Sequence, residues 1–409
     1  MWRYKILLLV LFVPLVLYTL WQSLRAFELR YFLQRFALYY SKPIDDDCVW
    51  IHAASVGEVN AVTPLILKIQ QENPSIKIVL SSNTITSARV AKTNLPESIQ
   101  HIYFPLDYSW AMNRLLKHLK PHVLFIVETE FWPNLYLLAH RKKIPFYTIN
   151  GRISEKTLRA KPWLKQIYAK ILPLINYVYA RSETDQERFL SLGIDAEKIE
   201  TLGNIKLALS ETSNISPIEL GRPYVLAAST REDEEQIIVA AWQKCQQQNH
   251  ILVIVPRHPN RIKNILSSLD HFNYNIAVRS KKNPVTNKTD IYIADTIGEL
   301  KNFIAGSEFV LMGGSFVPKG GHNILEVAQL GKAVVFGPDM RNFEEEAKLL
   351  LTIKAGIQSD KVQLPNILNK LLQDASHKHS LEKASQIFYN KNDDCISRYY
   401  KNITAFITL

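Results

Sequence analysis

The chain is poor in cysteine, with three residues among 409, Cys48, Cys245 and Cys395. They lie far apart and form no C-x-x-C pair, which argues against a disulfide framework and a cysteine zinc site and fits a reducing compartment. Glycine (14) and proline (19) are in the ordinary range, and 47% of the residues are hydrophobic. A collagen-like, low-complexity or disordered chain is therefore excluded. The length allows two folded domains of about 150–200 residues each plus an extension.

The excess of positive charge lies in the first half of the chain. Residues 1–210 carry 26 Lys and Arg against 17 Asp and Glu, a balance of +9, whereas residues 211–409 carry 23 against 21, a balance of +2. This asymmetry predicts an anionic partner for the first half, with nucleic acid and a membrane surface as the two candidates.

The N-terminus favours the membrane. Residues 6–21 are apolar except for Thr19 and are interrupted by Pro14, a run slightly shorter than the roughly 20 residues of a spanning helix. No small-residue cleavage site follows, so we expect an uncleaved anchor, with a removed signal sequence as the alternative.

A basic stretch follows the apolar run. In residues 23–40, Arg25, Arg30 and Arg35 alternate with aromatic residues and leucines. This pattern predicts an amphipathic helix that lies on an anionic leaflet.

The rest of the chain alternates β-rich runs with helical stretches, which predicts two doubly wound parallel α/β domains in tandem. We expect strands at residues 48–53, 77–81, 122–127, 145–150, 177–180, 224–228, 251–255, 291–294, 309–312 and 333–336. The predicted parts are an anchor and interfacial helix at 1–40, a first domain at 41–210, a linker at 211–223, a second domain at 224–390 and, at 391–409, a C-terminal helix packing back on the first domain. Ligands of such sheets bind at the carboxyl ends of strands.

Carboxylates follow two strands of the first domain. Glu58 begins a helix after the first strand, where it either acts as a general base or only complements the helix N-terminus. Glu128 and Glu130 follow the strand at 122–127 and share one face of an extended segment. For these two, a functional and a purely structural role are equally compatible with the sequence.

Basic residues follow three further strands. Asn150 and Arg152 are followed by several lysines, which form either a phosphate-binding site or a solvent-exposed basic surface. In the second domain, residues 228–231 and 256–261 combine hydroxyl groups with arginines. Such segments bind phosphate, although an ordinary helix cap explains the hydroxyl groups as well.

A glycine-rich loop follows the strand at 309–312. Four glycines within residues 313–321 predict backbone N–H groups that face an anion. Asn323 is a natural helix cap, and Glu326 completes a capping box. The loop lacks the ending of a P-loop and the spacing of a dinucleotide fingerprint, so a nucleotide phosphate is expected without ATP hydrolysis or hydride transfer.

These segments together resemble a known family. The motifs HAASVGE, ETEFWPN, NGRIS, GNIK, ASTREDEE, PRHPNR, DTIGEL, GGSFVPKGGHNILE and GPDMRNF occur in order. The chain is thereby similar to the 3-deoxy-D-manno-octulosonic acid (Kdo) transferases of lipopolysaccharide assembly. It departs from their usual pattern at Arg231, where histidine is common, and at Ser87, Asp233 and Lys319.

The resemblance implies a GT-B glycosyltransferase fold, with two Rossmann-like domains facing across a cleft. The second domain would hold CMP-Kdo, and the first would take lipid IVA, the lipid A precursor. The enzyme would lie on the cytoplasmic side of the bacterial inner membrane, in contact with anionic lipids, with no nucleic acid partner, metal or cofactor.

The resemblance also implies residue roles. Glu58 would be the general base of an inverting transfer, supported by Glu128 or Glu130. The donor-binding residues would be Ser229, Thr230, Arg231, Arg257, His258, Gly313, Gly314, Ser315, Gly320, Gly321, Asn323 and Glu326. The acceptor-binding residues would be Ser55, Gly57, Arg89, Asn150, Arg152 and Lys206.

Two alternatives remain at this point. A GT-B enzyme that uses a UDP-sugar would share the architecture and the glycine-rich loop. A non-enzymatic protein that binds anionic lipid or nucleic acid would explain the charge but not that loop.

Overall fold

The computed structural model describes residues 1–40, 47–207, 215–245, 249–392 and 394–407. The chain divides into two compact units, Met1–Ser210 with Asp394–Leu409, and Glu211–Asp393. The start of the predicted linker, residues 211–214, lies outside the described residues. The rest of that segment belongs to the second unit, where the Ile218 amide donates to the Asn302 carbonyl.

The first unit is built on a seven-stranded sheet of order β3-β2-β1-β4-β5-β6-β7, and all its pairs are parallel. Its strands are β1 (Cys48–His52), β2 (Ile78–Ser82), β3 (Gln100–Tyr103), β4 (Pro121–Val127), β5 (Phe146–Gly151), β6 (Tyr177–Ala180) and β7 (Ile199–Thr201). Its helices are α1 (Trp2–Ala26), α2 (Leu29–Arg35), α3 (Val56–Glu72), α4 (Ile85–Asn94), α5 (Ser109–Leu119), α6 (Pro133–Arg141), α7 (Glu155–Leu158), α8 (Pro162–Ile171), α9 (Glu183–Ser191) and α17 (Cys395–Ile407).

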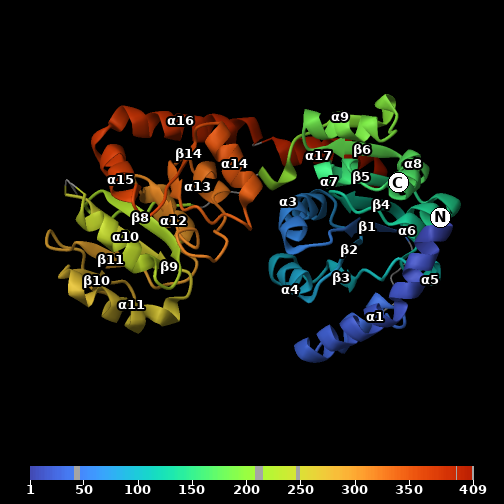
Figure 1. Ribbon diagram of the computed structural model, residues 1–409, viewed down its shortest axis with the longest axis horizontal. Helices are drawn as coiled ribbons and strands as arrows, with labels where there is room; N and C mark the ends of the chain where they lie inside the picture. The colour runs from blue at the N-terminus through green and yellow to red at the C-terminus, as the bar shows by residue number, and fades with distance from the viewer. Residues whose placement is uncertain (41–46, 208–214, 246–248, 393, 408–409) are drawn as a thin grey trace. The chain divides into compact units, whose positions relative to one another are not determined.

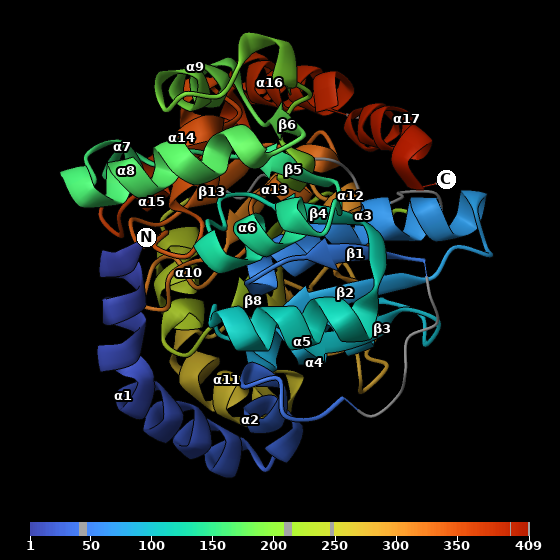
Figure 2. The ribbon, with the colours of Figure 1, turned by 90° about the vertical axis from the view of Figure 1, so that its right-hand side faces the viewer.

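Helices cover both faces of this sheet. Apolar residues of α5, α6 and α8 pack on one face, and these helices lie toward the viewer in Figure 2. Residues of α3, α4 and α17 pack on the other face. The C-terminal helix α17 is thus part of the first unit, and the Tyr399 hydroxyl on it donates to the Gly203 carbonyl at 3.0 Å.

The second unit repeats the architecture with a seven-stranded parallel sheet of order β10-β11-β9-β8-β12-β13-β14 (Figure 1). Its strands are β8 (Tyr224–Thr230), β9 (Ile251–Pro256), β10 (Ile276–Val278), β11 (Ile291–Ile293), β12 (Val310–Met312), β13 (Val334–Phe336) and β14 (Gly356–Gln358). Its helices are α10 (Glu234–Gln243), α11 (Ile262–Leu269), α12 (Leu300–Gly306), α13 (Leu325–Gln329), α14 (Glu344–Thr352), α15 (Leu364–Gln373) and α16 (Ala375–Asn392). The predicted tandem of parallel α/β domains is confirmed.

The N-terminal helix α1 is longer than the apolar run from which it was predicted. It spans 25 residues, includes Pro14, and is long and apolar enough to cross a membrane, with little of its apolar segment buried. Its first half is docked on the unit, because the Tyr4 hydroxyl donates to Asp107 Oδ2 at 2.8 Å and the Tyr108 hydroxyl to the Leu8 carbonyl at 2.7 Å.

The predicted amphipathic helix over 23–40 is wrong in its extent. α1 ends at Ala26, Phe27 adopts a left-handed conformation, and α2 has only seven residues. Arg35 is buried and does not face a leaflet, since its guanidinium donates to Asn83 Oδ1 at 3.2 Å and to the Phe104 carbonyl. A buried guanidinium needs such acceptors, and the fold supplies them from residues distant in sequence.

Candidate functional site

Glu58 lies at the start of α3, in the turn that follows β1. Ser55 caps the helix by accepting the Glu58 amide, and its hydroxyl donates to Glu58 Oε1 at 3.0 Å. The Ala54 amide donates to Oε2 at 2.6 Å. The carboxylate is therefore held at both oxygens by a capping arrangement, and each oxygen retains a free lone pair.

The environment of Glu58 makes it a stronger base than an ordinary glutamate. Burial, and then the charges of Glu128 and Glu130, raise its pKa to about 8, against the opposing hydrogen bonds from Ala54 and Ser55. Like charges close together and loss of water both disfavour the ionised form. The three carboxylates of the sequence prediction thus form one cluster.

Glu128 is paired with Lys206. Glu128 directly follows β4, is buried, and has a φ of 61°, a conformation that is uncommon outside glycine and is often found at functional sites. The Lys206 ammonium lies 2.6 Å from Glu128 Oε1. It is also near the helix start, because a Cβ at Gly57 would lie 4.0 Å from Lys206 Nζ.

Glu130 lies beside a buried histidine. Its Oε2 is 3.9 Å from Nε2 of His52, whose Nδ1 is 2.9 Å from the Ser81 hydroxyl. His52 is fully buried, and its Nε2 has no hydrogen-bond partner within the described structure. The HAASVGE segment therefore supplies His52 to the cluster beside Ser55 and Glu58, and the sequence analysis did not assign this histidine.

Asn150 stabilises the turn that carries Lys206. It is completely buried, and its Oδ1 accepts the Ile205 amide at 3.0 Å, which fixes the turn that carries Lys206. The Asn150 side chain is inaccessible in this structure, and its predicted contact with an acceptor stays a prediction. The backbone N–H of Asn150 donates to the Tyr399 hydroxyl at 3.2 Å.

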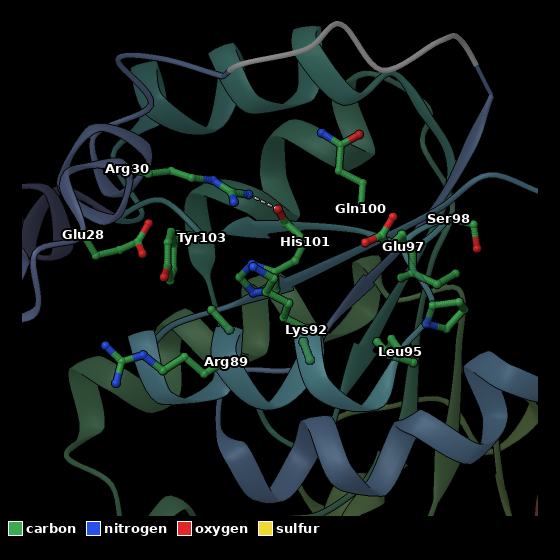
Figure 3. A pocket seen from close by; sticks show the side chains of 14 residues that line it. Glu28, Arg30, Arg89, Lys92, Leu95, Glu97, Ser98, Gln100, His101 and Tyr103 are labelled. Carbon is green, nitrogen blue, oxygen red and sulfur yellow. Dashed lines mark hydrogen bonds between the residues drawn. The ribbon is translucent and has the colours of Figure 1, made fainter.

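The remaining predicted acceptor residues lie elsewhere in the first unit. Arg152 follows β5 and is half-buried. Arg89 is exposed on α4 and lines a separate pocket with residues of α2 and β3 (Figure 3).

A basic cluster lies in the second unit. Arg231 follows β8, its Nε donates to Nε2 of His322 at 3.2 Å, and its Nη1 is 2.8 Å from Nε2 of His258. Burial, and then the charges of Arg231, Arg257 and His258, lower the pKa of His322 to about 4. His322 is thus neutral at pH 7, and because its Nε2 accepts from Arg231, its proton is on Nδ1.

The glycine-rich loop already holds an anion, the carboxylate of Glu234. The amides of Gly314, Ser315 and Phe316 donate to it at 2.5, 3.0 and 2.9 Å, and the Arg231 amide donates at 2.8 Å. In this structure these amides bind a side chain of the unit, and their assignment to a ligand phosphate stays a prediction. Burial raises the pKa of Glu234 despite these four donors.

Two hydroxyl groups predicted to bind the donor are engaged within the unit. The Ser315 hydroxyl donates to the Met312 carbonyl at 2.5 Å and accepts the Gly337 amide at 2.7 Å. The Thr230 hydroxyl donates to Glu235, which also pairs with Arg261. Ser315 and Thr230 are fully buried and shape the loops, and their assignment to the donor stays a prediction.

Close packing explains the glycines of the loop. A Cβ at Gly313 would lie 2.6 Å from the Ser229 carbonyl oxygen. Gly320 has a φ of 84°, and a Cβ there would lie 2.3 Å from Asn342 Nδ2. Gly313 is required for the close approach of the Ser229 backbone, and Gly320 for its left-handed conformation.

The helix after the loop starts later than predicted. Asn323 Oδ1 accepts the Leu325 amide at 3.1 Å, its Nδ2 donates to Glu326 Oε1 at 3.2 Å, and α13 begins at Leu325 with Ile324 as its cap. The predicted cap at Asn323 is therefore wrong. The Asn323 side chain forms a local turn, and the helix has only five residues.

Sequence reasoning missed Glu234, His52 and His322. Each stands inside a motif that was quoted, but its role depends on a partner far along the chain, as the 80 residues between Glu234 and Gly314 illustrate. Across the described residues, no group of three or more His, Cys, Asp and Glu side chains has the arrangement of a metal site.

Comparison with known proteins identifies relatives over most of the chain. The family model described as 3-deoxy-D-manno-octulosonic-acid transferase (kdotransferase) matches residues 30–209. A 3-deoxy-D-manno-octulosonic acid transferase of Rickettsia felis is 32% identical over 375 residues, 88% of this chain and 79% of the relative. A bifunctional glycosyltransferase/methyltransferase of Fusobacterium nucleatum is 33% identical over 81% of this chain, which spans only 53% of that protein.

Solved structures are similar to the chain in part or throughout. The C-terminal CMP-Kdo binding domain of WaaA from Acinetobacter baumannii is 30% identical, covers 41% of this chain and 89% of its own, and gives a TM-score of 0.39. The UDP-GlcNAc 2-epimerase of Neisseria meningitidis is 14% identical, with a TM-score of 0.55 over 87% of this chain and 99% of its own. The second likeness shows the fold alone.

Proposed function

The chain belongs to the 3-deoxy-D-manno-octulosonic acid (Kdo) transferase family, and from this membership we propose that it transfers Kdo from CMP-Kdo to lipid IVA. The transfer inverts the anomeric carbon, and Glu58 is its general base. The observation that carries this assignment is the buried carboxylate cluster around Glu58, with its raised pKa.

The chemistry needs one base and one site for the leaving group. Glu58 takes the proton of a primary hydroxyl of the acceptor glucosamine while that oxygen forms a bond to the anomeric carbon of Kdo. The bond from this carbon to the CMP phosphate breaks on the opposite face, and CMP leaves with the electron pair. A base with a pKa near the working pH combines proton affinity with a useful ionised fraction.

The neighbours of Glu58 have distinct proposed roles. The charge of Glu128 raises the pKa of Glu58, and the ion pair between Lys206 and Glu128 stabilises the ionised Glu128 beside it. Ser55 and the Ala54 amide fix the orientation of the base before the acceptor arrives. Such preorganised positioning avoids a reorganisation cost during the reaction.

The basic cluster of the second unit is the proposed site for the CMP phosphate. The partners of the Arg231 guanidinium are two imidazole rings, and no carboxylate pairs with it among the described residues. It therefore keeps its positive charge for a ligand, together with Arg257 and with the Nδ1–H donor of His322. Fixed donors aimed at a leaving phosphate stabilise the charge that develops in the transition state.

Membrane attachment of the enzyme rests on α1 and on the charge of the first half of the chain. The helix is long and apolar enough to span, and residues 1–210 carry a balance of +9. We expect α1 to anchor the protein in the inner membrane with both units on the cytoplasmic side. A bisphosphorylated glycolipid acceptor would meet the basic unit there.

The test is an in vitro transfer reaction with the full chain, CMP-Kdo and lipid IVA, with products resolved by mass spectrometry. Glu58→Gln should reduce transfer about 10²- to 10⁴-fold, the usual contribution of a general base. Glu72→Gln is the matched control, because Glu72 is exposed at the other end of α3, and it should behave like the wild type.

Two results would contradict the proposal. Stabilisation of the protein against heat by UDP but not by CMP would indicate a different donor. A normal rate for Glu58→Gln, with Kdo still transferred, would leave the donor assignment intact and remove Glu58 as the base.

A further inference from the structure

A pocket of about 690 Å³ lies on the first unit, apart from the carboxylate cluster (Figure 3). Its walls come from α4, from β3 and from the junction between α1 and α2. None of Glu58, Glu128, Glu130 and Lys206 lines it. The volume falls in the range of small-molecule sites, about 300–1,000 Å³.

Three cations line this pocket, Arg30, Arg89 and Lys92. Arg30 is fixed, because its guanidinium donates to the His101 carbonyl and its Cζ lies 5.9 Å from the centre of the Tyr103 ring. Arg89 and Lys92 are exposed on neighbouring turns of α4. Arginine and lysine in this arrangement are the usual ligands of phosphate.

The other polar groups leave a positive balance. His101 is neutral, since burial and then the charge of Arg30 lower its pKa to about 3. Glu28 and Glu97 are the acidic residues in the lining, so three cations face two carboxylates. Figure 3 shows Tyr103 between Arg30 and Arg89.

Three apolar residues at the junction of α1 and α2 are exposed. Phe27 is 97% exposed, and Leu24 and Leu29 are 63% and 61% exposed. Phe27 and Leu29 alternate in the sequence with Glu28 and Arg30, which line the pocket. Apolar side chains beside a cationic pocket match a molecule whose phosphate lies next to hydrocarbon.

We propose that this pocket binds the phosphate headgroup of a membrane phospholipid, with its acyl chains along the exposed end of α1. The site sets the depth and rotation of the first unit at the bilayer. This inference rests on the membrane attachment proposed for α1 and does not depend on the transfer reaction.

The test titrates detergent-purified full-length protein with phosphatidylglycerol and measures the first bound lipid by native mass spectrometry. The variant R89Q/K92Q removes two charges from the pocket, and K165Q/K170Q removes two exposed charges from α8 as the matched control. Two cations near a lipid phosphate should change the affinity about tenfold or more. We therefore expect at least tenfold weaker binding for R89Q/K92Q and no change for the control.

A phosphate-free lipid separates headgroup recognition from apolar contact. Diacylglycerol with the same acyl chains should bind weakly and equally to all three proteins. Equal phosphatidylglycerol binding by the three proteins, or equal binding of both lipids by the wild type, would overturn the proposal.

The acceptor is the other possible occupant. If R89Q/K92Q raised the KM for a phosphorylated lipid acceptor but not for one without phosphates, and left phosphatidylglycerol binding unchanged, the pocket would belong to the acceptor. The phospholipid assignment would then be wrong. Because lipid binding is measured without substrates, its failure is distinguishable from failure of the proposed transfer reaction.

Discussion

The raised pKa of Glu58 predicts a specific pH dependence for the transfer. With a pKa of about 8, roughly one tenth of the Glu58 carboxyl groups are ionised at pH 7. The value of kcat/KM should rise about tenfold from pH 6 to pH 7 and level off above about pH 8, because only the ionised base accepts the proton. Glu128→Gln removes the larger of the two charge effects on the pKa of Glu58, so this rise should move to lower pH. The pKa should not fall to 4.5, because burial contributes more to the shift than the charges do.

The assay is initial-rate measurement between pH 6 and 9 for the wild type, Glu58→Gln and Glu128→Gln, with donor and acceptor below saturation. Glu58→Gln should give a low rate without the rise. A wild-type profile that is flat from pH 6 to 9 would refute the reasoning, because the base would then already be ionised at pH 6. A rise that Glu128→Gln does not move would remove the proposed electrostatic role of Glu128.

The same pKa has a consequence for folding. The folded state binds the Glu58 proton more tightly than the unfolded state. The stability gained from this tighter binding is therefore fully present below pH 4.5 and is lost as the pH rises through about 8. Relative to Glu58→Gln, the free energy of unfolding of the wild type should fall by up to about 1.4 kcal/mol for each pH unit in this window. Denaturant titration of both proteins at pH 5 and pH 9 measures this difference.

Three further predictions concern the second unit. Glu234→Gln should lower the free energy of unfolding by about 1–3 kcal/mol, because a glutamine side chain cannot accept all four backbone donors that the carboxylate accepts. Thermal denaturation measures this change, and an unchanged Tm would contradict the structure of the loop. Arg231→Gln should weaken CMP binding about tenfold, as expected for the loss of one charge-assisted contact, with little change in Tm. Calorimetric titration with CMP measures the affinity, and a wild-type affinity would remove Arg231 from the proposed donor site. Ser315→Ala should cost about 1–3 kcal/mol of stability, because the Ser315 hydroxyl is buried between the Met312 carbonyl and the Gly337 amide. The CMP affinity of the folded protein should be unchanged. A loss of CMP affinity without a loss of stability would instead support the predicted contact of Ser315 with the ligand.

The sheets were predictable because their central strands are buried on both faces. Continuous apolar runs such as 122–127 and 251–255 mark such strands. The strands β3, β7, β10 and β14 were missed, although they are no shorter than β11, β12 and β13. They lie at the edges of the two sheets and are only partly buried, so their sequences lack the continuous apolar run of a central strand.

The carboxylate cluster was predictable for a related reason. Glu58 lies in the first turn of the helix after β1, and Glu128 directly follows the neighbouring strand β4. The carboxyl ends of adjacent parallel strands lie together. The partner Lys206 could be placed only through the family resemblance. The turn that carries Lys206 is fixed by Asn150, which is 55 residues from its hydrogen-bond partner Ile205.

The donor site could not be assigned from the sequence for one physical reason. Polar residues after a strand either meet a ligand or satisfy the buried backbone of neighbouring loops, and these two demands select the same residue types. The amides of the glycine-rich loop, for example, donate to the buried carboxylate of Glu234. Burial separates the two classes where sequence cannot, since Ser315 is inaccessible whereas Arg257 and His258 are exposed. The proposed donor site therefore uses accessible side chains such as those around Arg231, and the glycines allow the close packing of the neighbouring loop.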